Sequence, residues 1–184
     1  MNSWDEFFIK LAFEVSKKSK DPSTKVGCVL VGEDNVLLSI GFNGFPRGVL
    51  ETEEQAKEYF NKKCGTTGQI EVPGYDPYNS NSEFRFTRWG RPQKYSYVEH
   101  AERNSVYNAA RHGIRLQGAR AYLNWSPHPC ADCTRALIQA GIVEVIGPNI
   151  PFAGKGAGIN YSLDYAKTMF DEAEITQREV VWEK

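Results

Sequence analysis

The sequence predicts an α/β protein with a layered sheet, and two observations support this prediction. Apolar segments typical of strands alternate with helical segments through the second half of the chain. A helix followed by a hairpin of β-branched residues is expected in the first half. Because strands interleaved with helices pack as a sheet covered by helices, the pattern favours an α/β fold.

The first predicted element is an amphipathic helix over residues 4–19. Ser3 and Glu6 have the S-x-x-E spacing of a capping box, and apolar residues follow at helical spacing. The elements expected after this helix are buried strands at 26–31 and 36–40, joined by a turn at 32–35, and then a loop at 41–48.

A polar and aromatic segment at about 51–96 interrupts the pattern and has no sustained period of a helix or a strand. We therefore expect a single domain over residues 1–184 with an insertion at about 51–96. The elements expected after the insertion are a helix at 99–111, a strand at 119–124, a helix at 130–140, a strand at 143–146, a helix capped by Ser162 and a strand at 176–182.

The composition excludes several classes of protein. With 184 residues, 41% of them hydrophobic and 24% charged, the chain is long enough to bury a core and is unlike disordered chains. A formal net charge of −1 provides no positive field for polymeric nucleic acid. No run approaches the roughly 18 apolar residues that span a bilayer, and residues 1–6 lack a secretory signal, so we expect a cytoplasmic protein without a membrane partner.

One histidine, one glutamate and two cysteines have the spacing of a catalytic metal site. His100 and Glu102 form an H-x-E sequence, and Pro129, Cys130 and Cys133 form a P-C-x-x-C sequence. The combination resembles the H-x-E…P-C-x-x-C signature of zinc-dependent deaminases. Three imidazole and thiolate ligands leave the fourth tetrahedral position of Zn²⁺ open to water, as in catalytic zinc sites. We therefore expect one catalytic Zn²⁺ bound by His100, Cys130 and Cys133.

Glu102 is expected to be the catalytic proton shuttle. Zinc lowers the pKa of a bound water from about 15.7 to roughly 7, and Glu102 would take the proton before hydroxide attacks C4 of a pyrimidine ring. The same carboxylate would then protonate N3 and the leaving amine. Since a C-x-x-C pair also occurs in redox and structural sites, a zinc-stabilised module without catalysis stays an alternative.

Further segments resemble those of a known family. These segments are Asp21-Pro22-Ser23-Thr24-Lys25-Val26-Gly27, Gly41-Phe42-Asn43-Gly44-Phe45-Pro46, Tyr97-Val98-Glu99-His100-Ala101-Glu102-Arg103-Asn104 and Gln139-Ala140-Gly141-Ile142. With the zinc signature, they resemble the deoxycytidylate (dCMP) deaminases, including those of phages, within the cytidine-deaminase superfamily. The resemblance implies a three-layer α/β/α fold with a mixed central sheet. It also implies hydrolysis of dCMP to dUMP and ammonia by a zinc-activated water, in the host cytoplasm if the protein is phage-encoded.

The resemblance also implies the residues that contact the substrate. Asn43 would hydrogen-bond the deoxyribose hydroxyl, the Ala101 backbone and the region of Ser126 would hold the base edge, and Ser23 with Lys25 would lie near the 5′-phosphate. Local alternatives stay open, since Asn43 is also typical of a left-handed turn and Lys25 of a solvated loop end. The other cations that phosphate could use are Arg47, Arg88, Arg91 and Lys94.

Regulation and assembly are implied in the same way. Members of the family are often hexamers that dCTP activates and dTTP inhibits, and Mg²⁺ would accompany these triphosphates. Arg111, at the expected far end of the helix that begins near His100, would take part in subunit contact and effector response. The alternative for Arg111 is a cation that favours the helix dipole, worth a few tenths to about 1 kcal/mol. With only 3 histidines, the chain is not expected to bind a second zinc.

Other substrates remain open. Metal chemistry alone does not distinguish dCMP from dCTP, a free nucleoside or base, or adenosine in transfer RNA. The absence of net positive charge disfavours the polymer, and the family resemblance favours the monophosphate.

Overall fold

The computed structural model describes residues 3–52, 54–55, 58–59, 62, 87–89, 94–150 and 162–182. Contacts divide the chain into two compact units, one formed by residues 1–43 with 100–184 and the other by residues 44–99. Arg91, one of the cations named as candidates for phosphate binding, lies outside the described residues.

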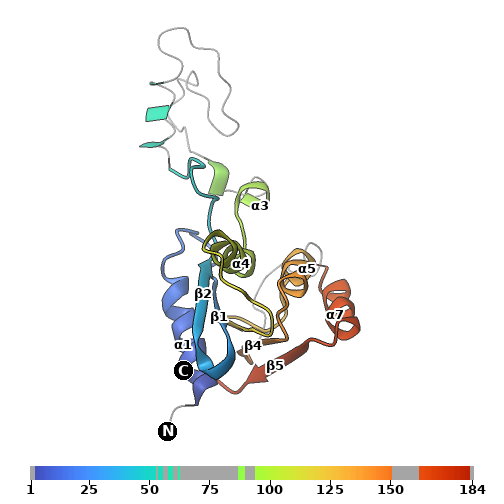
Figure 1. The fold of residues 1–184 in the computed structure, drawn as a ribbon. Helices are drawn as coiled ribbons and strands as arrows, with labels where there is room; N and C mark the ends of the chain where they lie inside the picture. The colour runs from blue at the N-terminus through green and yellow to red at the C-terminus, as the bar shows by residue number, and fades with distance from the viewer. Residues whose placement is uncertain are drawn as a thin grey trace. The chain divides into compact units, whose positions relative to one another are not determined.

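The first unit is a five-stranded sheet covered by helices (Figure 1). Its strands are β1 (Gly27–Val31), β2 (Leu37–Phe42), β3 (Arg120–Leu123), β4 (Glu144–Pro148) and β5 (Thr176–Val180). Its helices are α1 (Trp4–Ser16), α4 (Ala101–Arg111), α5 (Ala131–Gln139) and α7 (Leu163–Glu172), with a short 3-10 helix at Glu33–Asn35.

The sheet is mixed, as predicted. In the strand order β2-β1-β3-β4-β5, β1 is antiparallel to both of its neighbours, whereas β3, β4 and β5 are parallel. The carboxyl ends of β2 and β3 therefore lie at the same edge of the sheet as the start of β1. This edge, which is formed by strand ends and not by an outer strand, is where α4 and α5 begin.

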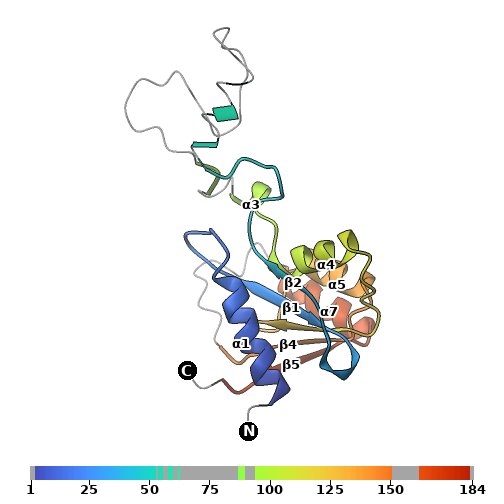
Figure 2. The same ribbon diagram turned by 60° about the vertical axis from the view of Figure 1, so that its left-hand side comes forward.

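Alternate side chains of the strands form two separate cores. In β1, Val29 and Val31 pack with α1 on one face, whereas Cys28 and Leu30 pack with α4 and α5 on the other. This alternation is the period of two expected of a strand that is buried on both faces. Figure 2 shows α1 on one side of the sheet and α4, α5 and α7 on the other, which makes three layers.

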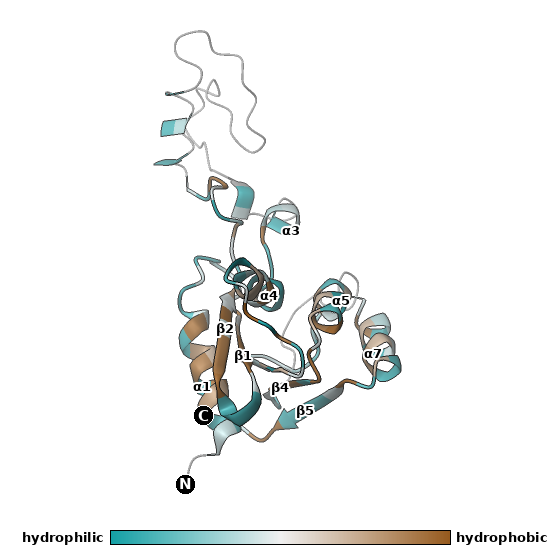
Figure 3. Ribbon diagram, viewed as in Figure 1, coloured by the Kyte–Doolittle hydropathy of each residue, from teal (hydrophilic) through white to brown (hydrophobic). Residues whose placement is uncertain are grey.

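The two edge strands differ in character. β5 (TQREV) is largely hydrophilic, whereas β2 (LLSIGF) is hydrophobic although it also lies at an edge (Figure 3). The side-chain amides of Asn104 and Asn108 on α4 donate to the carbonyls of Phe42 and Ile40, at 2.8 and 2.7 Å. These bonds satisfy acceptors on the strand edge that would otherwise be open to another strand.

The second unit contains a 3-10 helix at Thr87–Trp89 and α3 at Lys94–Tyr97. The ring of Phe45 stacks on that of Trp89, with centroids 4.4 Å apart. The Arg88 guanidinium lies 4.5 Å from the centre of the Tyr97 ring and donates to the Leu50 carbonyl. Arg88 therefore has a packing role inside this unit.

Several predicted boundaries are wrong by a few residues. Helix α1 ends at Ser16 and not at 19, where the Ser16 hydroxyl donates back to the Phe13 carbonyl. Strand β2 continues through Gly41 and Phe42, which were predicted to begin a loop, because Gly41 pairs with Cys28. Ser162 does precede α7, but its backbone is left-handed (φ 49°) and its side chain makes no capping bond.

No helix among the described residues is long and apolar enough to cross a membrane.

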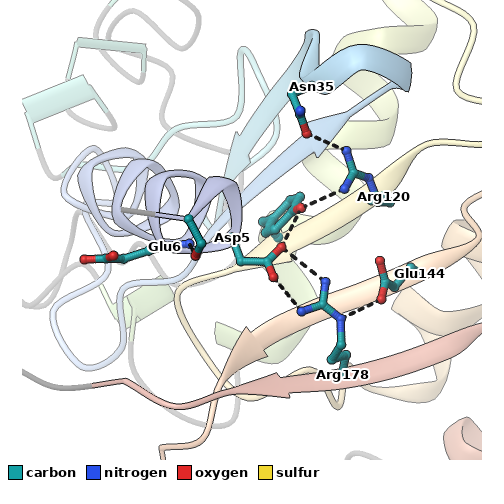
Figure 4. Close-up of polar contacts among 8 residues, drawn as sticks. Asp5, Glu6, Asn35, Arg120, Glu144 and Arg178 are labelled. Atoms are coloured by element: carbon teal, nitrogen blue, oxygen red, sulfur yellow. Dashed lines mark hydrogen bonds and ion pairs between the residues drawn. The ribbon is translucent and has the colours of Figure 1, made fainter. Parts of the chain in front are cut away.

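A polar network ties the start of α1 to three strands (Figure 4). Both oxygens of Asp5 accept hydrogen bonds from the Arg178 guanidinium, at 2.6 and 3.2 Å, and Arg178 Nε donates to Glu144 at 2.8 Å. Asp5 also accepts from the Tyr122 hydroxyl at 2.9 Å, and that hydroxyl accepts from Arg120. Because Arg120 and Glu144 are the first residues of β3 and β4, the network lies at the amino ends of these strands.

The network predicts a pH-dependent effect of Asp5→Asn. The substitution should lower the free energy of unfolding at pH 7 by about 1–2 kcal/mol, because charge-assisted hydrogen bonds to Arg178 are lost. Those bonds hold the pKa of Asp5 below its ordinary value. The stabilisation is therefore present above the unfolded-state pKa of about 3.9 and disappears as the pH falls through the lower pKa of the folded state.

Urea unfolding of both proteins at pH 7 and at successively lower pH measures this difference. Glu6→Gln is the matched control, since Glu6 lies in the same helical turn but pairs with Lys10 on the surface, and it should cost less than about 0.5 kcal/mol. Equal losses in the two variants, or a loss in Asp5→Asn that persists at low pH, would contradict the role assigned to the network.

Candidate metal centre

Three side chains of metal-ligating type come together in the part of the chain that the structure describes. The ligand atoms of His100, Cys130 and Cys133 all lie within 4.8 Å of one another. Nδ1 of His100 is 3.4 Å from the sulfur of Cys130 and 3.4 Å from that of Cys133. Residues 30 positions apart in the sequence thus form one compact group.

Two helix starts place these ligands. His100 is the N-cap residue of α4 and Cys130 that of α5, and neither side chain caps its own helix. Cys133 is buried in the first turn of α5. The positive ends of both helix dipoles therefore lie at the group, where they favour thiolate over thiol.

Two glycines allow the backbone to approach closely at this edge. A Cβ at Gly41 would lie 2.3 Å from the Ala101 carbonyl oxygen and 2.3 Å from the Ser105 nitrogen, in the first turns of α4. A Cβ at Gly147 in β4 would lie 2.2 Å from the Trp125 carbonyl oxygen, in the loop that leads to Cys130. Both ligand-bearing segments thus rest on backbone that carries no side chain.

The pKa values of the two cysteines shift in opposite directions, because one hydrogen bond joins their sulfur atoms. A hydrogen bond from Cys133, together with His100, lowers the pKa of Cys130 to about 4. The same bond and burial raise the pKa of Cys133. Burial lowers the pKa of His100, but the neighbouring Cys130 and Glu102 outweigh this effect and leave it raised.

Glu102 lies beside the ligands in the first turn of α4 and is 7% exposed. Burial raises its pKa above the ordinary value, the charge on His100 opposes this shift, and the charge on Cys130 adds to it. A buried carboxyl with a raised pKa takes up and releases a proton nearer to neutral pH, which suits general acid–base chemistry.

The donor set fits one Zn²⁺. In a tetrahedral centre with Zn–S of about 2.3 Å and Zn–N of about 2.0 Å, sulfur and nitrogen lie about 3.5 Å apart. The observed separations of 3.4 Å agree with this value. One imidazole and two thiolates are also the ligand types that zinc prefers, and the group among the described residues contains three protein ligands, which leaves one position for a small ligand.

Other contacts fix the two helix starts relative to each other. Nη1 of Arg103 on α4 lies 3.3 Å from a carboxylate oxygen of Asp132, a residue of α5 that lies between the two cysteines in the sequence. Asp132 also pairs with Arg135 on its own helix. On α4, the buried Ser105 hydroxyl donates to the Glu102 carbonyl at 2.6 Å.

The residues that the family resemblance links to the substrate lie near this edge of the sheet, but they differ in how far their side chains are buried. Ala101 is the first residue of α4, where backbone N–H groups have no partner within the helix. Ser126 is 7% exposed, in the loop between β3 and Cys130. Ser23 and Lys25 lie in the segment before β1 with exposed side chains. Asn43 follows β2 directly and is 6% exposed.

Three further residues are not part of the group of ligands. Arg111 is the exposed last residue of α4, about 15 Å along the helix axis from its start. His128 lies outside the group of ligands, with Nδ1 3.0 Å from Gln177 and Nε2 3.4 Å from Glu179. Cys28 is a buried free thiol, and burial raises its pKa.

Sequence reasoning missed two buried polar side chains beside the site. Asp21, 1% exposed, accepts from the backbone of Ser23 and Thr24. Asn124, at the end of β3, accepts from the Gly27 nitrogen at 2.8 Å and donates to the Lys25 carbonyl at 3.2 Å. The Asp-Pro-Ser-Thr sequence is a signal of a turn that could have identified Asp21, whereas Asn124 has no local signal.

Comparison with known proteins identifies related sequences. The model of the family described as the cytidine and deoxycytidylate deaminase zinc-binding region matches residues 2–147. A probable deoxycytidylate deaminase of Drosophila melanogaster is 32% identical over 152 residues, which cover 83% of this chain and 62% of the fly protein. The chain thus spans less than two thirds of that relative. The deoxycytidylate deaminase of Enterobacteria phage T4 is 31% identical over 145 residues, 75% of this chain and 74% of the phage protein.

Solved structures agree on the fold. The crystal structure of dCMP deaminase from the cyanophage S-TIM5, in complex with dCMP and dUMP, is similar with a TM-score of 0.58 at 20% identity, over 95% of both chains. At this level of identity the likeness establishes the three-layer architecture around the mixed sheet.

Proposed function

Because the chain belongs to the cytidine and deoxycytidylate deaminase family, whose members are zinc-dependent hydrolytic deaminases, we propose that it hydrolyses dCMP to dUMP and ammonia. The proposal rests on one observation above all: the buried Glu102 lies beside an imidazole and two thiols that fit an open zinc site. An acid–base group next to a metal site with a free position is what hydrolysis of an amine requires.

Relatives favour dCMP among the cytosine nucleotides. The T4 protein is named a deoxycytidylate deaminase and the Drosophila protein a probable deoxycytidylate deaminase, and the structure of the cyanophage enzyme was solved with dCMP and dUMP. The formal net charge of −1 is compatible with a small anionic ligand, because a mononucleotide needs only a few donors placed locally.

The residues of this chain divide the chemistry between them. His100, Cys130 and Cys133 would hold Zn²⁺, which would supply a water of lowered pKa for attack at C4. Glu102 would accept a proton from that water and donate it to N3 of the ring. It would then take the proton of the hydroxyl that has added to C4 and pass it to the exocyclic nitrogen, so that the C4–N bond breaks and ammonia leaves. The raised pKa of Glu102 suits both halves of this exchange.

Further residues are proposed to bind the substrate. Asn43 meets the deoxyribose, the Ala101 backbone and Ser126 hold the base, and Ser23 and Lys25 lie near the phosphate. Their positions in one unit at one edge of the sheet support this assignment.

Two other functions remain as competitors. A deaminase of dCTP or of a free nucleoside would use the same metal chemistry. A non-catalytic zinc module would need its zinc only for stability, and a fourth protein ligand would favour it. Among the described residues the metal group has three members, which favours catalysis.

Ammonia release from dCMP, dCTP, cytidine and adenosine-containing RNA tests the proposal. We expect turnover of dCMP to exceed that of the other compounds. A preference for dCTP or cytidine would reassign the substrate, and no turnover of any of them by zinc-loaded protein would favour the structural module.

Glu102→Gln should retain zinc and lose 10²- to 10⁴-fold in kcat, roughly the contribution of general acid–base catalysis. The amide has nearly the shape of the carboxyl, but it cannot move a proton. Zinc content and kcat for dCMP are measured on the same preparation, with Glu172→Gln, an exposed residue of α7, as the control that should behave as the unmodified protein. Activity that survives in Glu102→Gln would remove this residue from the mechanism.

Allosteric control is part of the proposal. We propose that dCTP activates and dTTP inhibits the enzyme, with Mg²⁺ bound to the triphosphates, in a cytoplasmic homohexamer. Arg111 is the candidate link to assembly, since it lies exposed at the end of the helix whose start carries Glu102.

Arg111→Glu should therefore weaken both assembly and the response to dTTP, because a cation at the proposed contact becomes an anion. Sedimentation and inhibition curves measure the two effects. Arg115→Glu, the same charge change at another exposed arginine, is the control. If Arg111→Glu assembles and responds to dTTP as the control does, Arg111 has no regulatory role.

A further inference from the structure

The carboxylate of Asp21 organises the loop in front of β1. Its Oδ1 accepts from the Ser23 nitrogen at 2.8 Å, from the Ser23 hydroxyl at 2.9 Å and from the Thr24 nitrogen at 3.1 Å. Its Oδ2 accepts from Nδ2 of Asn43 at 3.1 Å. A buried carboxylate thus joins a local turn to a side chain 22 residues further along the chain.

These contacts fix which way the Asn43 amide points. Nδ2 donates to Asp21 and, at 2.8 Å, to the Thr24 carbonyl, while Oδ1 accepts from the Val26 nitrogen at 2.7 Å. A backbone N–H can only donate, and a carbonyl or carboxylate oxygen can only accept, so all three contacts favour the same orientation of the amide. Both N–H groups of Asn43 are therefore used inside the protein, and only Oδ1 keeps a lone pair for a ligand.

The position of Asn43 connects it to the metal centre. It directly follows Phe42, whose carbonyl accepts from Asn104 at 2.8 Å, two residues beyond Glu102 on α4. The Asn43 nitrogen also pairs with the Val26 carbonyl at the start of β1. Asn43 thus belongs to the edge of the sheet at which α4 begins.

We propose that Asp21 is a positioning residue that makes Asn43 a pure hydrogen-bond acceptor toward the substrate, so that this part of the site selects a donor. The inference rests on the proposed function. Above pH 7 the phosphate, with a second pKa of about 6, is almost fully ionised, and dCMP then has donors only at its 4-amino group and its 3′-hydroxyl. The 4-amino group is the group that is removed at the metal, so Asn43 accepts from the 3′-hydroxyl.

Analogues that differ only at the 3′-position test the polarity of Asn43 in the unmodified protein. Compared with dCMP, the 3′-deoxy analogue should lose roughly tenfold in kcat/KM, as expected for one lost hydrogen bond to a buried acceptor. The 3′-fluoro analogue, which can only accept, should be as poor. The 3′-amino analogue, which can donate, should keep most of the activity.

Asp21→Asn tests the positioning role. Its amide would set an N–H against that of Asn43, so that one of the three contacts that orient the Asn43 amide becomes repulsive and the amide is held less firmly. The variant should lose the preference for dCMP over the 3′-deoxy analogue, through a higher KM for dCMP and with kcat changed less. Asp5→Asn is the matched control, because it makes the same change in the network at the opposite edge of the sheet, and it should keep the preference.

Each outcome supports or overturns a defined statement. Equal rates for dCMP and the 3′-deoxy analogue, or a 3′-fluoro analogue as good as dCMP, overturn the acceptor role of Asn43. An Asp21→Asn protein that keeps the full preference overturns the role of Asp21. The analogue series needs no variant, so it decides the polarity even if Asp21→Asn does not fold. Unmodified protein that releases no ammonia from dCMP contradicts the proposed function itself, whereas active protein without 3′-selectivity contradicts only this inference.

Discussion

The convergence of two helix N-termini at one edge of the sheet is the constraint on which the rest of the site depends. Helices α4 and α5 begin at His100 and Cys130, so their dipoles point their positive ends at the same group of ligand atoms. Gly41 and Gly147 permit this convergence, because any side chain there would overlap backbone of the segments that carry the ligands. The metal chemistry is therefore a consequence of backbone packing on the sheet.

Two acidic groups at the same edge have pKa values shifted in opposite directions. Cys130 is stabilised as a thiolate, whereas burial keeps the pKa of Glu102 high. The thiolate of Cys130 is therefore suited to bind a metal. The carboxyl of Glu102, which holds a proton more readily than usual, is suited to carry protons to and from a metal-activated water. The opposite edge, where Asp5 and Arg178 lie, carries a network whose contacts tie α1 to the strands.

Much of the fold and of the metal group could be predicted from sequence because the signals are local. The apolar, β-branched run at residues 26–31 predicted a buried strand, and the two short motifs around His100 and Cys130 predicted the ligands. The end of β2 was wrong because Gly41 is typical of a strand break, and only its packing against α4 explains a glycine in that place. The link from Asp5 to Arg178 spans 173 residues and has no local signal. The turn sequence around Asp21 is a local signal, but the bond from Asn43 to Asp21 depends on how β2 returns beside the loop.

X-ray absorption at the zinc edge of the purified protein measures the central claim most directly. An open site made by His100, Cys130 and Cys133 predicts one zinc per chain, with two sulfur ligands at about 2.3 Å, one imidazole nitrogen at about 2.0 Å and one further light atom that belongs to no protein side chain. Protein that holds no zinc, or zinc whose four positions are all filled by side chains, would contradict it.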